Sequence, residues 1–155
     1  MKIAVGSDHA GLSLKKVIIS HLEQKGLEFK DFGTYTEDSC DYPDYAEKVA
    51  VNVRDKNFDF GILVCGTGIG ISIAANKVEG IRAAVCADTF SAHASREHND
   101  ANILALGERV VGPGLAIDIV DIFLSSKFEG GRHQKRVDKI TAIEKIRNDF
   151  GGKNE

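Results

Sequence analysis

The chain has 155 residues, of which 43% are hydrophobic, a size and composition that fit a single domain with an ordinary core. Its 20 basic and 23 acidic residues give a formal charge of −3 at pH 7, which argues against nucleic-acid binding through a broadly basic surface. No segment approaches the roughly 18 apolar residues of a membrane span. The N-terminus also lacks the apolar stretch of a signal peptide, so we expect no membrane partner.

Three cysteines occur, at positions 40, 65 and 86, without a C-x-x-C pair. An odd number in this arrangement argues against both a disulfide framework and a structural zinc site. We therefore expect a reducing, cytoplasmic setting.

Short β-branched runs alternate with longer helical patterns over the first 126 residues, which is typical of repeated β-α-β units. The pattern predicts an α/β fold, a Rossmann-like three-layer α/β/α sandwich with a five-stranded parallel sheet. The predicted strands are residues 2–6, 27–32, 60–65, 81–86 and 102–106. The predicted helices are residues 12–25, 43–54, the segment after residue 70 up to about 77, 89–99, 115–124 and 133 to about 149.

The last predicted helix has no strand after it. Its apolar positions, Val137, Ile140, Ile143 and Ile146, form one stripe among charged residues. Such a stripe needs an apolar surface to cover, so we expect this helix to pack on a neighbouring subunit. We expect one domain over residues 1–150 and a flexible tail over 151–155.

Ligands of parallel α/β sheets bind outside the carboxyl ends of the strands, and there this chain is polar or rich in glycine. Gly66-Thr67-Gly68-Ile69-Gly70 follows the third predicted strand, where its backbone N–H groups could hold an anion. The loop is not a dinucleotide fingerprint, because residue 71 is isoleucine, and no Gly-Lys-Ser/Thr follows as in a Walker loop. The alternative is that the glycines only permit a tight turn and close helix packing.

Cys65 directly precedes this loop, whose amide groups would favour a thiolate. A thiolate here could act as a base, whereas a phosphatase-like nucleophile would need arginine at residue 71. The alternative is a small buried hydrophobe, which is our interpretation of Cys40 and Cys86. His98 could donate a proton to a ligand, or it could be an ordinary surface histidine. His93 lies five residues before it, too far around a helix for the two to share a metal ion.

Arg132 and Arg136 lie four residues apart, on one face of the last predicted helix. Two neighbouring guanidinium groups match the geometry of a phosphate group. The alternative is a solvated basic turn.

Taken together, these residues resemble the ribose-5-phosphate isomerase B family, which belongs with the allose- and galactose-6-phosphate isomerases. The resemblance covers nearly the whole chain in order. The matching segments are Gly6-Ser7-Asp8-His9-Ala10-Gly11, Asp41-Tyr42-Pro43, residues 65–77 from Cys65 to Lys77, Arg96-Glu97-His98-Asn99-Asp100-Ala101-Asn102 and residues 129–136 from Glu129 to Arg136.

The resemblance implies a metal-independent aldose–ketose isomerase of the pentose phosphate pathway that interconverts ribose 5-phosphate and ribulose 5-phosphate without a cofactor. It implies that Cys65 is the base, that His98 aids opening of the furanose ring, and that Thr67 assists proton movement. The implied substrate-binding residues are Gly66, Gly68, Ile69 and Gly70 for the enediolate, Asp8, Tyr42 and Asn99 for sugar hydroxyls, and His9, Arg109, Arg132 and Arg136 for the phosphate. One branch of the family uses a glutamate as base where this chain has Ile71, so this chain resembles the cysteine branch.

The resemblance also implies a homodimer or homotetramer with sites shared between subunits. As a hypothesis, Arg132 and Arg136 serve the site of the neighbouring subunit. Two alternatives remain open: an isomerase of allose 6-phosphate or galactose 6-phosphate, and a non-catalytic sugar-phosphate sensor.

Overall fold

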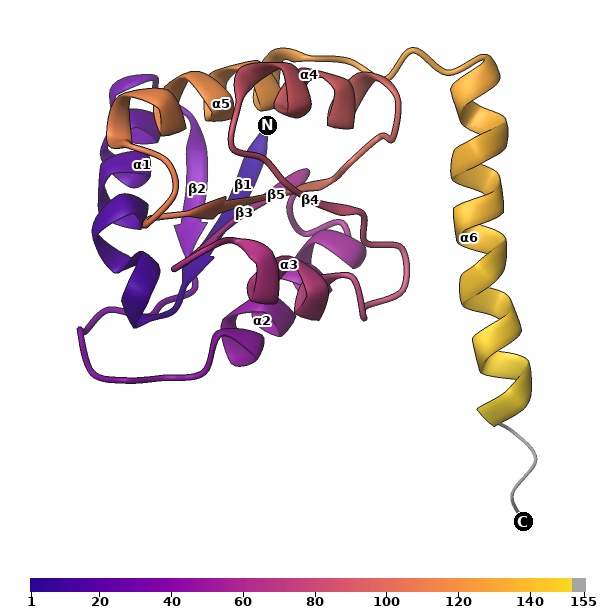
Figure 1. The fold of residues 1–155 in the computed structure, drawn as a ribbon, viewed down its shortest axis with the longest axis horizontal. Coiled ribbons are helices and arrows are strands. Elements are labelled where there is room, and N and C mark those ends of the chain that lie inside the picture. Colours follow the sequence, from indigo (N-terminus) through magenta and orange to yellow (C-terminus); the bar gives the residue numbers. More distant parts are fainter. Residues whose placement is uncertain (152–155) are drawn as a thin grey trace.

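Five parallel strands form one central sheet in the order β2-β1-β3-β5-β4, with helices on both faces, in a computed structural model of the chain (Figure 1). The structure describes residues 1–151, with side chains described for residues 1–146. The strands are β1 (Lys2–Ser7), β2 (Glu28–Asp31), β3 (Phe60–Cys65), β4 (Ala83–Val85) and β5 (Ile103–Gly107). The helices are the 3-10 turn η1 (His9–Gly11), α1 (Leu12–Gln24), α2 (Tyr42–Arg54), α3 (Ile69–Ala75), α4 (Thr89–Glu97), α5 (Pro113–Ser125) and α6 (Arg132–Gly151). The predicted α/β sandwich is confirmed.

Two apolar cores lie on opposite faces of the sheet. Alternate side chains of a strand point to opposite faces, so Ile62 and Val64 of β3 join the core under α1, α4 and α5. Leu63 and Cys65 point the other way, into the core under α2 and α3. Both faces of β3 are therefore buried, as its unbroken apolar sequence predicts.

The fourth strand is shorter than predicted, because side-chain hydrogen bonds take the place of strand pairing before Ala83. The Arg82 N–H group donates to Oδ1 of Asn102, at 2.8 Å. The Asn102 N–H group in turn donates to the Arg82 carbonyl, at 3.0 Å. These bonds join Arg82 to Asn102 at the amino-terminal edge of the sheet, and the regular strand begins only at Ala83.

The first turn of α1 is stabilised from a distant part of the chain. The N-terminus of α1 has no side-chain cap from its own N-cap residue, Gly11. Instead, a carboxylate oxygen of Glu108 accepts the N–H group of Leu14, at 2.9 Å. This bond ties α1 to the segment that follows β5.

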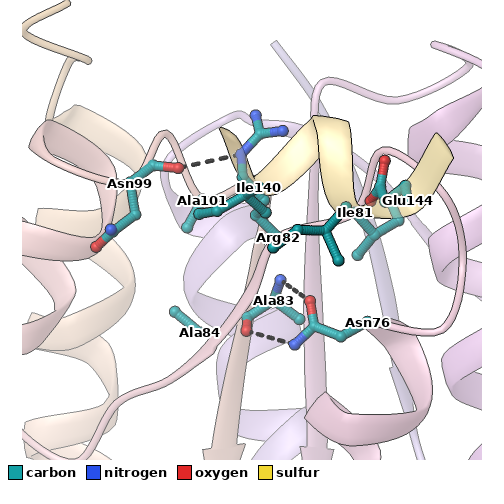
Figure 2. Close-up of a pocket in the computed structure, with 10 residues that line it drawn as sticks. Asn76, Ile81, Arg82, Ala83, Ala84, Asn99, Ala101, Ile140 and Glu144 are labelled. Carbon is teal, nitrogen blue, oxygen red and sulfur yellow. Dashed lines mark hydrogen bonds between the residues drawn. The ribbon is translucent and has the colours of Figure 1, made fainter. Parts of the chain in front are cut away.

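The last helix, α6, stands away from the sheet and contacts the rest of the chain mainly at its first turns (Figure 1). Val137 is buried, but Ile143 and Ile146 are 66% and 57% exposed. A cavity of about 500 Å³ separates α6 from the β4 edge of the sheet, and both Ile140 and Glu144 line it (Figure 2). The apolar stripe is thus uncovered within one chain, and its predicted packing on a neighbour stays a prediction.

The predicted tail begins one residue inside the last helix. Gly151 belongs to α6, and residues 152–155 lie outside the described part of the chain. Within residues 1–151, no helix is both long enough and apolar enough to cross a bilayer.

Candidate active site

Cys65 ends β3 and lies under the glycine-rich loop, with 4% of its surface exposed. The backbone N–H group of Gly68 donates to its sulfur, at 3.1 Å. An amide that donates to sulfur stabilises negative charge on a thiolate. The side chain is therefore both part of the core and bound to the loop that the sequence indicates as an anion site.

The loop can take this shape only with glycine at position 68. Gly68 has a φ of 79°, in the left-handed region that L side chains rarely adopt. A Cβ atom there would lie 2.8 Å from Cγ2 of Val85 and 2.9 Å from the carbonyl carbon of Leu106. The alternative interpretation of the glycines, a tight and closely packed turn, is therefore true at this position, and the sulfur contact exists in addition to it.

The segment after β5 packs against the same loop and is hydrogen-bonded to it. A Cβ atom on Gly107 would lie 2.5 Å from the carbonyl carbon of Thr67, so the two backbones touch. The N–H groups of Glu108 and Arg109 donate to the carbonyl oxygens of Cys65 and Gly66, at 2.9 and 3.0 Å. The exposed Arg109 side chain lies beside Gly66, where a Cβ atom would come within 3.2 Å of Nη1. A guanidinium group thus borders the loop, and phosphate binding by Arg109 stays a prediction.

Asp8 and His9 lie on the other side of β3. Asp8 is 5% exposed, and its Oδ1 atom accepts the Gly11 N–H group, at 3.1 Å. The backbone N–H group of Asp8 donates to the carbonyl of Val64, at 3.3 Å. The Nδ1 atom of His9 accepts the N–H group of Cys40, at 3.2 Å. In the neutral imidazole the ring hydrogen then lies on Nε2, which can donate to a ligand.

Tyr42 covers the start of α3 next to the loop. A Cβ atom on Gly70 would lie 2.7 Å from the ring carbon Cζ of Tyr42. The tyrosine is the first residue of α2 and is partly exposed. We call the following residues the carboxyl-edge group: Asp8, His9, Tyr42, Cys65, Thr67 and Arg109. The structure brings these six predicted site residues together.

His98 and Asn99 lie at the opposite edge of the sheet. Helix α4 leaves the carboxyl end of β4 and runs back along the sheet, and His98 is its C-cap. The Nε atom of Arg82, the residue before β4, donates to the Asn99 carbonyl, at 3.0 Å. Because Arg82 precedes β4, this bond places Asn99 at the amino-terminal edge, where the residue lines the cavity beside α6 (Figure 2).

The first turn of α6 joins His98 at this edge. The imidazole rings of His98 and His133 are stacked, with centroids 4.4 Å apart and planes 10° from parallel. The Glu129 N–H group donates to the carbonyl of Glu97, at 3.1 Å, which brings the start of α6 to the end of α4. The exposed arginines of this turn lie here as well, so we call His98, Asn99, Arg132 and Arg136 the amino-edge group.

Within residues 1–146, one cluster offers several possible metal ligands: His98, Glu129 and His133, with ligand atoms within 4.8 Å of one another. A metal ion bound to an imidazole nitrogen lies close to the plane of that ring, because the lone pair does. Two nearly parallel planes do not meet at one ion, so this stack would have to open to bind a metal. The sequence prediction that the site uses no metal stays a prediction.

The separation of the two groups is the main feature that the sequence does not predict. The resemblance implies that Cys65 and His98 act on one ligand, yet they lie at opposite edges of the sheet. The five residues of β5 alone span on the order of 15 Å. His133 is also absent from the predicted site residues. A signal exists, since His133, Val137 and Ile140 share one face of a helix, and this continues the apolar stripe to the histidine.

Comparison with known proteins gives consistent results over nearly the whole chain. A family model described as Ribose/Galactose Isomerase matches residues 3–140. The chain is 56% identical to Escherichia coli ribose-5-phosphate isomerase B over 147 residues, which cover 95% of this chain and 99% of that protein. A structure of Clostridium thermocellum ribose-5-phosphate isomerase B superimposes with a TM-score of 0.94 at 60% identity, covering 95% of this chain and 99% of that one. A Mycoplasma genitalium ribose-5-phosphate isomerase B structure with bound ribulose-5-phosphate gives a TM-score of 0.89 at 47% identity, covering 93% and 96%.

Proposed function

The chain belongs to the ribose/galactose isomerase family and is an aldose–ketose isomerase, and we propose that two copies of it build each site in which ribose 5-phosphate and ribulose 5-phosphate are interconverted. One copy supplies the carboxyl-edge group and the other supplies the amino-edge group. The observation that carries this proposal is the separation of the two groups across the sheet of a single chain.

Cys65 is the proposed base. Its thiolate removes the proton from C2 of the open-chain aldose, and the electrons of that bond form the C1–C2 double bond of an enediolate with negative charge on O1. The proton then returns to C1, while the hydroxyl proton moves from O2 to O1 with the assistance of Thr67. The Gly68 N–H group donates to the sulfur and the Ile69 N–H group donates to Oγ1 of Thr67, so the other amides of the loop are the proposed donors for the enediolate.

The remaining carboxyl-edge residues hold the substrate. Asp8 and Tyr42 flank the glycine-rich loop and are proposed to bind sugar hydroxyls. His9 presents Nε2–H, and Arg109 presents a guanidinium group, which suits a phosphate group at the same edge.

His98 is proposed to open the furanose ring by donating a proton to the ring oxygen. It cannot reach a substrate at Cys65 of its own chain, because His98 and Cys65 lie at opposite edges of the sheet. The uncovered stripe of α6 supports assembly with a second copy, since Ile143 and Ile146 are exposed in one chain. Arg132 and Arg136 would then reach the neighbouring phosphate together with His98.

The test mixes two inactive variants, Cys65→Ala and His98→Asn, under conditions in which subunits exchange. Random exchange gives one intact site in each mixed dimer, so about one quarter of the wild-type activity on ribose 5-phosphate should return. The matched control mixes Cys65→Ala with the double variant Cys65→Ala/His98→Asn, which can build no intact site. Absence of recovery after exchange has been verified would refute the shared site.

The choice of sugar phosphate is a separate question, because the family includes isomerases of galactose phosphates. Steady-state kinetics with ribose, allose and galactose phosphates should give the highest kcat/KM with ribose 5-phosphate. The three free cysteines suit a reducing compartment, which supports a cytoplasmic enzyme.

A further inference from the structure

The stacked pair of imidazoles joins the proposed ring-opening residue to a residue without an assigned role. His98 is partly exposed, whereas His133 is 5% exposed, so one face of the His98 ring is covered by the buried ring of His133. A nearly parallel stack fixes the plane of both rings. Rotation of the His98 ring out of this plane would break the contact.

The His133 ring is itself held in place by the first turn of α6. Its backbone N–H group donates to the Gly130 carbonyl, at 3.0 Å. Its Nε2 atom lies 3.4 Å from Nε of Arg132 and 3.4 Å from a carboxylate oxygen of Glu129. One turn further along α6, Val137 is buried against the rest of the chain. His133 is therefore the fixed member of the pair.

Burial and the neighbouring positive charges disfavour a positive charge on His133. Burial, followed by repulsion from His98 and Arg132, holds the pKa of His133 below its usual value. Arg136 acts in the same direction, and Glu129 acts against it.

We infer that His133 is a positioning residue for His98: its buried ring fixes the plane in which His98 presents a proton to the ring oxygen of a cyclic sugar phosphate. The inference rests on the proposed function. It gives His133 a role in ring opening and not in proton transfer, because the stacked rings lie at the amino-terminal edge of the sheet, opposite the edge at which Cys65 of the same chain lies.

The chemistry of the two substrates separates ring opening from proton transfer. Ribose 5-phosphate is mainly a furanose closed through O4, and it must open before C2 can be deprotonated. Ribulose 5-phosphate cannot close in the corresponding way, because a 2-ketose would need O5, which carries the phosphate. A defect in ring opening therefore lowers kcat for the aldose, whereas the ketose direction avoids the defective step by releasing the open-chain aldose, which then closes in solution.

The experiment compares His133→Leu, which fills the buried space without an aromatic face, with His133→Phe, which keeps the face. For His133→Leu, kcat on ribose 5-phosphate should fall at least about tenfold relative to kcat on ribulose 5-phosphate, as for loss of a general acid. For His133→Phe, the ratio of kcat on ribose 5-phosphate to kcat on ribulose 5-phosphate should stay close to that of the wild type. The exposed neighbour Gln134, replaced in Gln134→Ala, is the matched control and should leave both rates unchanged.

Several results would overturn the inference. If His133→Leu lowers kcat equally for both substrates, His133 has a general structural or phosphate-binding role. If His133→Phe lowers kcat on ribose 5-phosphate relative to kcat on ribulose 5-phosphate as much as His133→Leu does, the ring nitrogens matter rather than the aromatic face. If neither variant folds, the test is the chemical shift of the His98 ring protons in the wild type, because stacking on His133 must move these NMR signals upfield. Signals without an upfield shift would overturn the inference. If the proposed shared site itself fails, mixing Cys65→Ala with His98→Asn will restore no activity, whatever the result for the His133 variants.

Discussion

At the scale of single residues, position 68 requires glycine for two reasons, its backbone conformation and the lack of space for a side chain. Its left-handed φ excludes most side chains on conformational grounds, and its contacts with Val85 and Leu106 leave no room for a methyl group. Its N–H group also donates to the sulfur of Cys65. A substitution there must therefore affect both stability and the proposed base.

Gly68→Ala should lower the free energy of unfolding by about 1–3 kcal/mol and should also reduce kcat. The matched control is Gly80→Ala, because Gly80 has the same φ of 79° but a Cβ atom there would meet no other atom within 4 Å. The control should lose stability from conformation alone and keep kcat. Urea unfolding and steady-state kinetics measure the two effects, and a normal kcat in Gly68→Ala would contradict the role of the amide.

Cys86 differs from Cys65 in its surroundings and gives a prediction about pH. Burial raises the pKa of the Cys86 thiol from 9.0 to about 11. The unfolded chain ionises this thiol at lower pH than the folded chain, so the folded state gains stability from it below pH 9. That contribution is lost as the pH rises through 9 toward 11.

The measurement compares urea unfolding of the wild type and Cys86→Ala between pH 7.5 and pH 10.5. Other groups titrate in this range, so the difference between the two proteins is the readout. The wild type should lose more stability than the variant on going to high pH. If the free energy of unfolding changes with pH in the same way for both proteins, Cys86 has the same pKa in the folded and unfolded states.

At the scale of elements, a buried lysine joins helix α1 to β2 and to the loop after it. Lys15 is 1% exposed, and its Nζ atom lies 2.7 Å from Oδ1 of Asp31 and also donates to the Thr34 carbonyl. This loop leads to Cys40, whose N–H group donates to His9. The lysine thus helps to hold the carboxyl-edge group in place through the loop.

Lys15→Met should destabilise the fold by about 3–5 kcal/mol, because it leaves Asp31 without its partner. The double variant Lys15→Met/Asp31→Leu removes both charges and should recover much of that loss. Unfolding in urea measures both variants. A double variant that is no more stable than Lys15→Met would show that the hydrogen bonds of Lys15 to the Thr34 carbonyl and of Gly33 to Asp31 matter more than the ion pair.

At the scale of the whole molecule, we expect α6 to gain stability from assembly with a second copy, because part of its apolar surface is uncovered in a single chain. Its side chains Ile143 and Ile146 expose apolar surface, and the cavity beside Ile140 leaves the helix only partly supported. If a second copy covers this surface, a charge placed on the stripe should separate the subunits.

Ile143→Asp should shift the protein toward monomer and reduce activity on ribose 5-phosphate to the same extent, since a monomer has no complete site. Thr141→Asp is the matched control, because residue 141 lies on the opposite side of the helix and is exposed. Sedimentation velocity gives the oligomeric state of each variant. A fully active monomer would contradict the shared site.

The amino-acid sequence alone establishes the α/β class, the parallel sheet, and the residues that follow each strand, because burial on both faces and strand-end glycines are local properties. It also indicates Cys65 and its loop as a centre of chemistry. Only the folded chain shows that His98 and Cys65 lie at opposite edges of the sheet and that His133 covers His98. The physical reason is that a helix after a parallel strand runs back along it, so residues at its two ends face different edges. The predicted helix over residues 89–99 carries a signal for the place of His98, whereas the stacking of His98 on His133 depends on tertiary packing that no local pattern specifies.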